Sequence, residues 1–370
     1  MSSRELIYPM DKRIANLDLL RATAILMVVA YHVVQWLPMK PKWLVFLSQP
    51  GQYGVNLFFA LSGFLVGGLY FREKITSGSV DKTRFILRRI TRTVPVYLIA
   101  LAVSFLGSAL FEGEKFEWRY LVFLQNYMEV IPFFKVSWSL CVEEHFYALL
   151  PFVLAILYLF HRRMGSWPLK IIVLGLLLLP TYLRITSFQP NQPFGVATTA
   201  SQVYMDSLGL GVLAAWFSIN WRVARAQANF YGIICFLALM AALFGTHWAS
   251  AATIFGPGLL LMGLLFAALT LFSASSYQLN LATHPFVKFM AVSSYSIYIT
   301  HAVVLQALNM LMRRMPEFIQ GLWPIVLFLF ASVSLVAGVV FYKMIEYPLL
   351  ALREKYYPSR QITASASVRG

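Results

Sequence analysis

Ten long apolar stretches are the feature that most constrains how this chain of 370 residues can fold. Each runs for about 15 to 24 residues, enough for a helix to cross a bilayer when tilt and fraying are allowed. Hydrophobic residues make up 59% of the chain and charged residues only 12%, so one soluble core could not hide this much apolar surface. We therefore predict an all-α membrane protein, a polytopic bundle of about ten transmembrane helices. The expected spans are Leu17–Trp36, Gly54–Tyr70, Val94–Leu110, Trp138–Leu159, Leu169–Leu183, Ala197–Phe217, Phe230–Phe244, Ala249–Phe272, Met290–Met310 and Leu322–Tyr342.

The positive charges fall unevenly between the two sides that these spans define. If the N-terminus is cytoplasmic, 21 of the 30 Lys and Arg lie in cytoplasmic segments, 8 lie in outside loops, and Arg21 lies in a span. This asymmetry follows the positive-inside rule and predicts both termini in the cytoplasm. Membrane orientation then explains the net charge of +15, so no nucleic-acid partner is expected.

The sequence predicts one domain and a short tail. We expect residues 1–350 to form the transmembrane domain and residues 351–370 a cytoplasmic tail, disordered at its end, with no second soluble domain. Cys141 and Cys235 are the two cysteines, and both lie in apolar stretches. Their number and placement argue against a disulfide framework or a cysteine metal site.

The first span contains ionisable residues that are costly in lipid. A charge at the bilayer centre costs about 2.5 to 3.5 kcal/mol or more, yet this span holds Asp18, Arg21 and His32. Arg21 and His32 are eleven residues apart, so they share one helix face about 16.5 Å apart along the axis. Asp18 can pair with Arg21 one turn away. Either this face enters a functional site, or it holds an interfacial ion pair and a histidine that bonds a neighbouring helix.

A second polar group occurs in "SWSLCVEEHFY", residues 137–147. Helix counting puts Glu143 about 7.5 Å below Trp138, at a depth similar to that of His32. A carboxylate that fixes the tautomer of a histidine makes it a competent general base, so we expect Glu143 to orient His32. Glu144 points elsewhere and needs a partner of its own. His145 has no neighbours at a three-ligand spacing, so no metal is expected.

An arginine run and a small-residue segment complete the candidates. In "KTRFILRRITRTVP", Arg84, Arg88 and Arg92 repeat every four residues beside Arg89. Such a stripe either touches anionic lipid heads or holds a phosphate-rich cofactor. The second span, "GQYGVNLFFALSGFLVGG", has small residues around Ser62 that permit close helix packing or close approach of a ligand. Further polar residues at membrane depth are Asp206 and His301, and Glu346 lies near the inner face.

Together these segments resemble the acyltransferase-3 family of integral membrane acyltransferases. The resemblance covers nearly all of residues 15 to 350 and begins with Arg21, ten residues and His32, the family's arginine-x10-histidine pattern. Two departures are His145, where glutamine is common, and Asn56, where aspartate is frequent. The remaining segments occur in the family's order: "GVNLFFALSGFL", "RRITRTVP", "VSWSLCVEEHFY", "YMDSLGLG", "SYSIYITH" and "EYP".

The resemblance implies transfer of an acyl group, often acetyl, from cytoplasmic acyl-CoA to a hydroxyl, usually of a surface or secreted carbohydrate. It places the chain in the bacterial inner membrane, in contact with lipid, as a stand-alone domain without a fused esterase-like domain. We expect His32 and Glu143 to be catalytic. The donor would be bound by Arg21, Arg88, Arg89, Arg92 and Ser62, and the acceptor by Trp138, Glu144, Asn126 and Asp206.

Two other functions stay open on the residues alone. A transporter would use the buried charges as a proton or substrate path, but no internal repeat supports it. An enzyme that acylates a small cytoplasmic molecule, a glycoside for example, is the other. Trp118, Tyr120 and Tyr127 favour an outside carbohydrate if they face sugar rings, although an interfacial aromatic belt explains them equally well. No oligomeric state follows from the residues.

Overall fold

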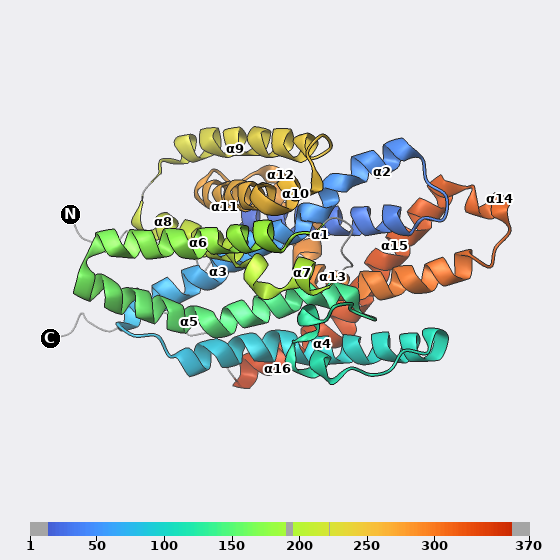
Figure 1. Ribbon diagram of the computed structural model, residues 1–370, viewed down its shortest axis with the longest axis horizontal. Helices are drawn as coiled ribbons and strands as arrows, with labels where there is room; N and C mark the ends of the chain where they lie inside the picture. Colours follow the sequence, from blue (N-terminus) through green and yellow to red (C-terminus); the bar gives the residue numbers. More distant parts are fainter. Residues whose placement is uncertain (1–13, 190–194, 222, 357–370) are drawn as a thin grey trace.

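The computed structural model describes residues 14–189, 195–221 and 223–356, and this part of the chain is helical without any strand. Several of the longest helices run along the long axis of the molecule (Figure 1). Nine helices in the described ranges are long and apolar enough to cross a membrane. The all-α polytopic architecture is therefore confirmed, and the chain is a multi-pass membrane protein. The end of the expected tail, residues 357–370, lies outside the described residues.

Most of the long helices follow the expected spans closely. The long helices are α1 (Ala15–Trp36), α3 (Gly54–Ser77), α4 (Lys82–Glu112), α5 (Trp138–Met164), α6 (Ser166–Ser187), α8 (Met205–Asn220), α9 (Arg225–Gly245), α11 (Leu259–Ser275), α13 (Pro285–Met312) and α15 (Trp323–Phe341). Short helices are α2 (Lys42–Ser48), α7 (Val196–Thr199), α10 (Ala251–Thr253), α12 (Asn280–Thr283), α14 (Glu317–Gln320) and α16 (Tyr347–Tyr356). Single 3₁₀ turns are η1 (Gln49–Tyr53), η2 (Trp118–Val122), η3 (Gln125–Tyr127), η4 (Lys135–Ser137) and η5 (Ser201–Val203), and π-turns are η6 (Ile254–Gly258) and η7 (Tyr342–Glu346).

The sixth expected span differs from the prediction. In place of one helix over Ala197–Phe217, the chain forms α7, the turn η5 and then α8. At 16 residues, α8 is about 24 Å long, short of the roughly 30 Å hydrocarbon core. It packs closely on α3 instead: a Cβ added at Gly211 would lie 2.2 Å from the Ala60 carbonyl oxygen. This helix is stabilised by its packing against α3 inside the bundle, and its length is too short for it to cross the hydrocarbon core unaided.

The segment between α4 and α5 folds back into the bundle. Tyr120 is fully buried, and its hydroxyl donates to the Phe133 carbonyl. The Gln125 amide donates to the Tyr97 hydroxyl and to Ser137 Oγ, each at 3.0 Å. Because Tyr97 lies midway along α4, the first turn of α5 begins beside the middle of α4. Residues 113–137, the inward loop, therefore place the polar start of α5 deep inside the molecule.

Candidate active site

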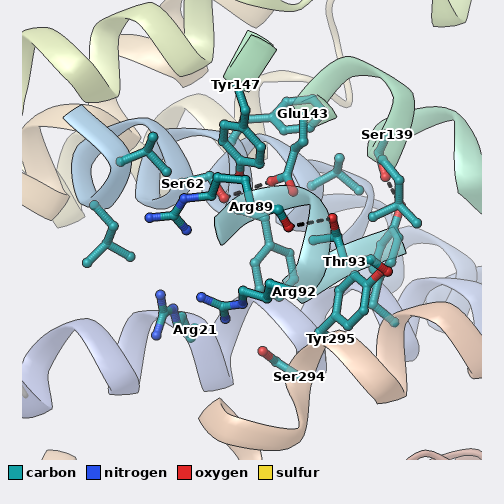
Figure 2. Close-up of a pocket in the computed structure, with 17 residues that line it drawn as sticks. Arg21, Ser62, Arg89, Arg92, Thr93, Ser139, Glu143, Tyr147, Ser294 and Tyr295 are labelled. Carbon is teal, nitrogen blue, oxygen red and sulfur yellow. Dashed lines mark hydrogen bonds between the residues drawn. The ribbon is translucent and has the colours of Figure 1, made fainter. Parts of the chain in front are cut away.

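One polar cavity lies where α1, α3, α4, α5 and α13 meet, with a volume of about 110 Å³. Figure 2 shows side chains from all five helices converging on it. Its apolar wall comes mainly from α3, which contributes Phe58, Phe59 and Leu65. The polar side chains that line it are Arg21, Ser62, Arg89, Arg92, Thr93, Ser139, Glu143, Tyr147, Ser294, Tyr295 and Tyr298.

Three arginines gather at one side of this cavity. Arg21 comes from the second turn of α1, and Arg89 and Arg92 come from the third turn of α4 (Figure 2). The expected ion pair of Arg21 with Asp18 is long, at 3.9 Å. The Arg89 guanidinium lies 5.8 Å from the centre of the Tyr147 ring, a cation–π contact. Three guanidinium groups beside one lining carboxylate, Glu143, make this side of the cavity suited to an anion with several oxygens.

The two adjacent glutamates have separate partners, as the sequence predicts. Glu143 accepts a hydrogen bond from Ser62 Oγ at 2.7 Å, which ties α5 to α3. Glu144 accepts from Thr93 Oγ1 at 2.5 Å, which ties α5 to α4. Of this pair only Glu143 lines the cavity.

His32 lies beyond the cavity wall, against a second histidine. Its Nδ1 is 2.9 Å from the Val28 carbonyl oxygen and 3.4 Å from Nε2 of His301 in α13. The expected pairing of Glu143 with His32 is not formed. The inward loop is the reason, because it starts α5 beside Tyr97 and so sets the two glutamates at the level of Thr93, deeper in the bundle than helix counting from the membrane surface implied.

Tyr298 stands between the cavity and the histidine pair. It lines the cavity, and its hydroxyl is 2.6 Å from Ser139 Oγ and donates to the Val136 carbonyl at 3.1 Å. Its ring centroid is 5.6 Å from that of His301. Tyr298 therefore contacts both the cavity and His301, the histidine that faces His32.

Several residues that the sequence assigned to the site have other contacts. The Arg88 guanidinium lies 3.8 Å from Glu354 in α16. Asn126 is buried and donates to Ser201 Oγ at 2.9 Å and to the Thr199 carbonyl at 3.1 Å. Neither side chain lines the cavity.

Asp206 and Trp138 also lie outside the cavity lining. Asp206 is fully buried and forms a 2.6 Å ion pair with Arg184 of α6. The expected span Leu169–Leu183 ended one residue before Arg184, whereas α6 extends to Ser187 and includes it. Trp138 packs its ring between Phe59 and Tyr204, at centroid distances of 6.1 and 4.7 Å. These contacts join helices to one another.

Sequence reasoning missed three tyrosines of the lining, Tyr147, Tyr295 and Tyr298. Each lies in a segment already singled out, because Tyr147 ends "SWSLCVEEHFY" and the other two belong to "SYSIYITH". Their spacing was the available signal: Tyr298 precedes His301 by three residues, which puts both on one helix face. No group of three His, Cys, Asp or Glu side chains that could hold a metal occurs among the described residues.

Comparison with known proteins shows a family match over most of the chain. Residues 14–343 match the family described as "Acyltransferase domain". A Staphylococcus aureus (strain COL) protein provisionally named O-acetyltransferase SACOL0978 is 25% identical over 377 residues, which cover 92% of this chain and 58% of that protein. The O-acetyltransferase OatA of S. aureus (strain NCTC 8325) is also 25% identical, over 90% of this chain and 57% of its own length. The chain thus spans less than two thirds of these relatives, and no solved structure matches it.

Proposed function

The chain belongs to the acyltransferase domain family that its residues 14–343 match, and from this premise we propose that it is a membrane O-acetyltransferase. It would move an acetyl group from acetyl-CoA to a hydroxyl of a carbohydrate. The observation that carries the proposal is the cavity in which Arg21, Arg89 and Arg92 face the same space inside a membrane bundle. The names of the relatives support the reaction type, since both contain O-acetyltransferase.

The arginine side of the cavity is the proposed donor site. Guanidinium groups bind phosphate oxygens through paired hydrogen bonds, and CoA carries three phosphates on one end of a long thioester arm. Ser62 and Glu143 line the polar wall next to the arginines, and Ser139 and Tyr298 lie further along it. The thioester would extend along this wall and past Tyr298 toward His32.

His32 is the proposed general base. Its Nε2 would take the proton of the acceptor hydroxyl, and the resulting alkoxide would attack the thioester carbonyl carbon. Collapse of the tetrahedral intermediate would break the carbon–sulfur bond, and the thiolate of CoA would take the proton back from His32. The products are an acetyl ester and CoA. Glu143, which bonds Ser62 and not His32, would position the donor in this scheme.

The acceptor would reach His32 from the side opposite the arginines. We place the protein in a bacterial inner membrane with Arg84 to Arg92 at the cytoplasmic face, because the positive-inside rule orients it so. Of the aromatic residues that could face sugar rings, Trp118 and Tyr127 are exposed, whereas Tyr120 is fully buried. Asn126 and Asp206, which bond other parts of the bundle and not the cavity, would have a structural role and would not bind the acceptor.

A donor-binding experiment tests the proposal. Membrane vesicles that contain the protein are given [1-¹⁴C]acetyl-CoA, and alkali-labile label on the acceptors of the same membranes is counted. Arg89→Ala and Arg92→Ala should each raise the KM for acetyl-CoA by about tenfold or more, since a charge-assisted hydrogen bond contributes about 1.5 to 3 kcal/mol. Arg163→Ala, at the exposed end of α5, is the matched control. An unchanged KM in both cavity variants would show that the arginines do not hold the donor.

A further inference from the structure

The contact between His32 and His301 joins one specific nitrogen atom of each ring. His301 is fully buried in α13, and His32 is half-buried in α1. Their ring centroids are 4.9 Å apart at an interplanar angle of 62°, an edge arrangement rather than a stack. In this arrangement Nε2 of His301 approaches Nδ1 of His32 at 3.4 Å. One nitrogen of each ring is thus engaged with the other ring.

The hydrogen bonds of His301 determine which tautomer its neutral ring adopts. Its Nδ1 lies 2.6 Å from the Tyr298 carbonyl oxygen and 3.2 Å from the Ile297 carbonyl oxygen. Carbonyl oxygens only accept, so Nδ1 of His301 must carry a hydrogen. In the neutral ring the other nitrogen, Nε2, then has a free lone pair, and this lone pair faces His32.

The same argument applies to His32. Its Nδ1 faces two acceptors, the Val28 carbonyl oxygen at 2.9 Å and Nε2 of His301 at 3.4 Å. A hydrogen on Nδ1 can be donated to the Val28 carbonyl and shared with Nε2 of His301 in a three-centre bond, whereas a bare Nδ1 would face two lone pairs. Neutral His32 therefore keeps its hydrogen on Nδ1 and its lone pair on Nε2. A flip of the ring would put a carbon against both acceptors.

We propose that His301 is a positioning residue, which together with the Val28 carbonyl holds His32 in the Nδ1–H tautomer and so presents Nε2 as the base. The inference rests on the proposed function, in which His32 takes the proton of the acceptor. His301 thus has the role of orienting His32 that the sequence predicts for Glu143. When Nε2 of His32 gains a proton, the lone pair of His301 faces a cationic ring and stabilises it.

The ionisable groups around His32 are consistent with a neutral partner. From its own helix, Tyr31 contacts it edge-on at 5.2 Å between centroids. From α13, His301 contacts it directly, and Tyr298 lies behind His301 at 5.6 Å between their centroids. A neutral imidazole stabilises the charged base less than a carboxylate would. The proton is then returned more readily to the leaving thiolate.

Two substitutions of His301 separate positioning from proton transfer. The side-chain oxygen of glutamine reaches the place of Nε2 and accepts a hydrogen bond but does not relay a proton at neutral pH, whereas leucine fills the space without an acceptor. In the vesicle assay with [1-¹⁴C]acetyl-CoA, His301→Leu should lower kcat by about 100-fold, the lower range of a general base's contribution, with the KM for acetyl-CoA within about twofold. His301→Gln should recover activity to within about tenfold of the unmodified protein. His161→Leu, at the exposed end of α5, is the control for loss of a histidine.

The outcomes distinguish the inference from the proposed function. His301→Leu with unchanged kcat would overturn the positioning role, and so would equal inactivity of both variants with normal KM, which indicates a proton relay. His32→Ala that keeps near-normal turnover would instead remove the base from the proposed function. If His301→Leu does not fold, ¹⁵N-histidine spectra of the unmodified protein in nanodiscs decide. The His32 signals, identified by their loss in His32→Ala, should show a protonated Nδ1, and a protonated Nε2 alone would overturn the inference.

Discussion

Removing the carboxylate of Asp206 should destabilise the bundle strongly without acting on the donor site. Asp206 and Arg184 are both fully buried, with 2.6 Å between Oδ2 and the guanidinium. The same guanidinium donates to the carbonyls of Val203 and Gly256, so Arg184 cannot leave when its partner is lost. Breaking a buried pair from one side costs about 3 to 5 kcal/mol, because the remaining charge has no counter-ion. The substitution Asp206→Ala should therefore lower the free energy of unfolding by about 3 to 5 kcal/mol.

The assay is thermal unfolding of the purified protein in detergent, with a double-mutant cycle. Asp206→Ala and Arg184→Ala should each lower the midpoint by many degrees. The combination Arg184→Met with Asp206→Leu should recover most of the loss, because apolar residues of similar volume replace a buried pair at little cost. Glu317→Ala, an exposed change in α14, should stay within about 0.5 kcal/mol. A midpoint for Asp206→Ala equal to that of Glu317→Ala, together with a raised requirement for acceptor, would refute the structural role and restore the acceptor-binding one.

Other changes test the packing, the donor site and the orientation. Gly211→Ala should lower the yield of folded protein in a size-exclusion assay, because its Cβ would meet the backbone of Ala60 at 2.2 Å and overpacking costs about 1 to 3 kcal/mol or more; normal yield would contradict the close contact of α3 and α8. Arg21→Lys should raise the KM for acetyl-CoA about tenfold, since an ammonium cannot form a two-pronged bond; an unchanged KM would mean that a point charge suffices. Ser79→Cys should resist a membrane-impermeant thiol reagent in intact cells while Glu317→Cys is labelled, and the reverse pattern would invert the proposed orientation.

The helices were predictable where apolar length alone decides them. Spans such as Leu17–Trp36 and Val94–Leu110 correspond to α1 and to the C-terminal two thirds of α4, because a long apolar run in lipid has no alternative to helix. The prediction failed at Ala197–Phe217, where a short helix is held by contact with α3. Hydropathy does not distinguish a helix enclosed by protein from one that spans the bilayer.

The candidate site was predictable in its residues more than in its pairings. Of the residues assigned to the donor site, Arg21, Arg89, Arg92 and Ser62 line one cavity, whereas Arg88 contacts Glu354. The partner of His32 was not predictable, because helix counting assumed that α5 begins at the membrane surface. The hydrogen bonds of Gln125 and Tyr120 that draw the inward loop into the bundle are long-range contacts, which no periodicity records.

If the protein acts across an energised membrane as proposed, the arginines at one side of the cavity have an electrical consequence. Each elementary charge carried through the bilayer costs or yields about 2.3 kcal/mol per 100 mV, and CoA carries several. In the proposed function Arg21, Arg89 and Arg92, which line the cavity, hold the phosphates, so only the uncharged thioester arm with its acetyl group extends past Tyr298. Acetyl transfer would then move no net charge across the membrane and would be independent of the membrane voltage. The cell could modify its exterior without dissipating its membrane potential.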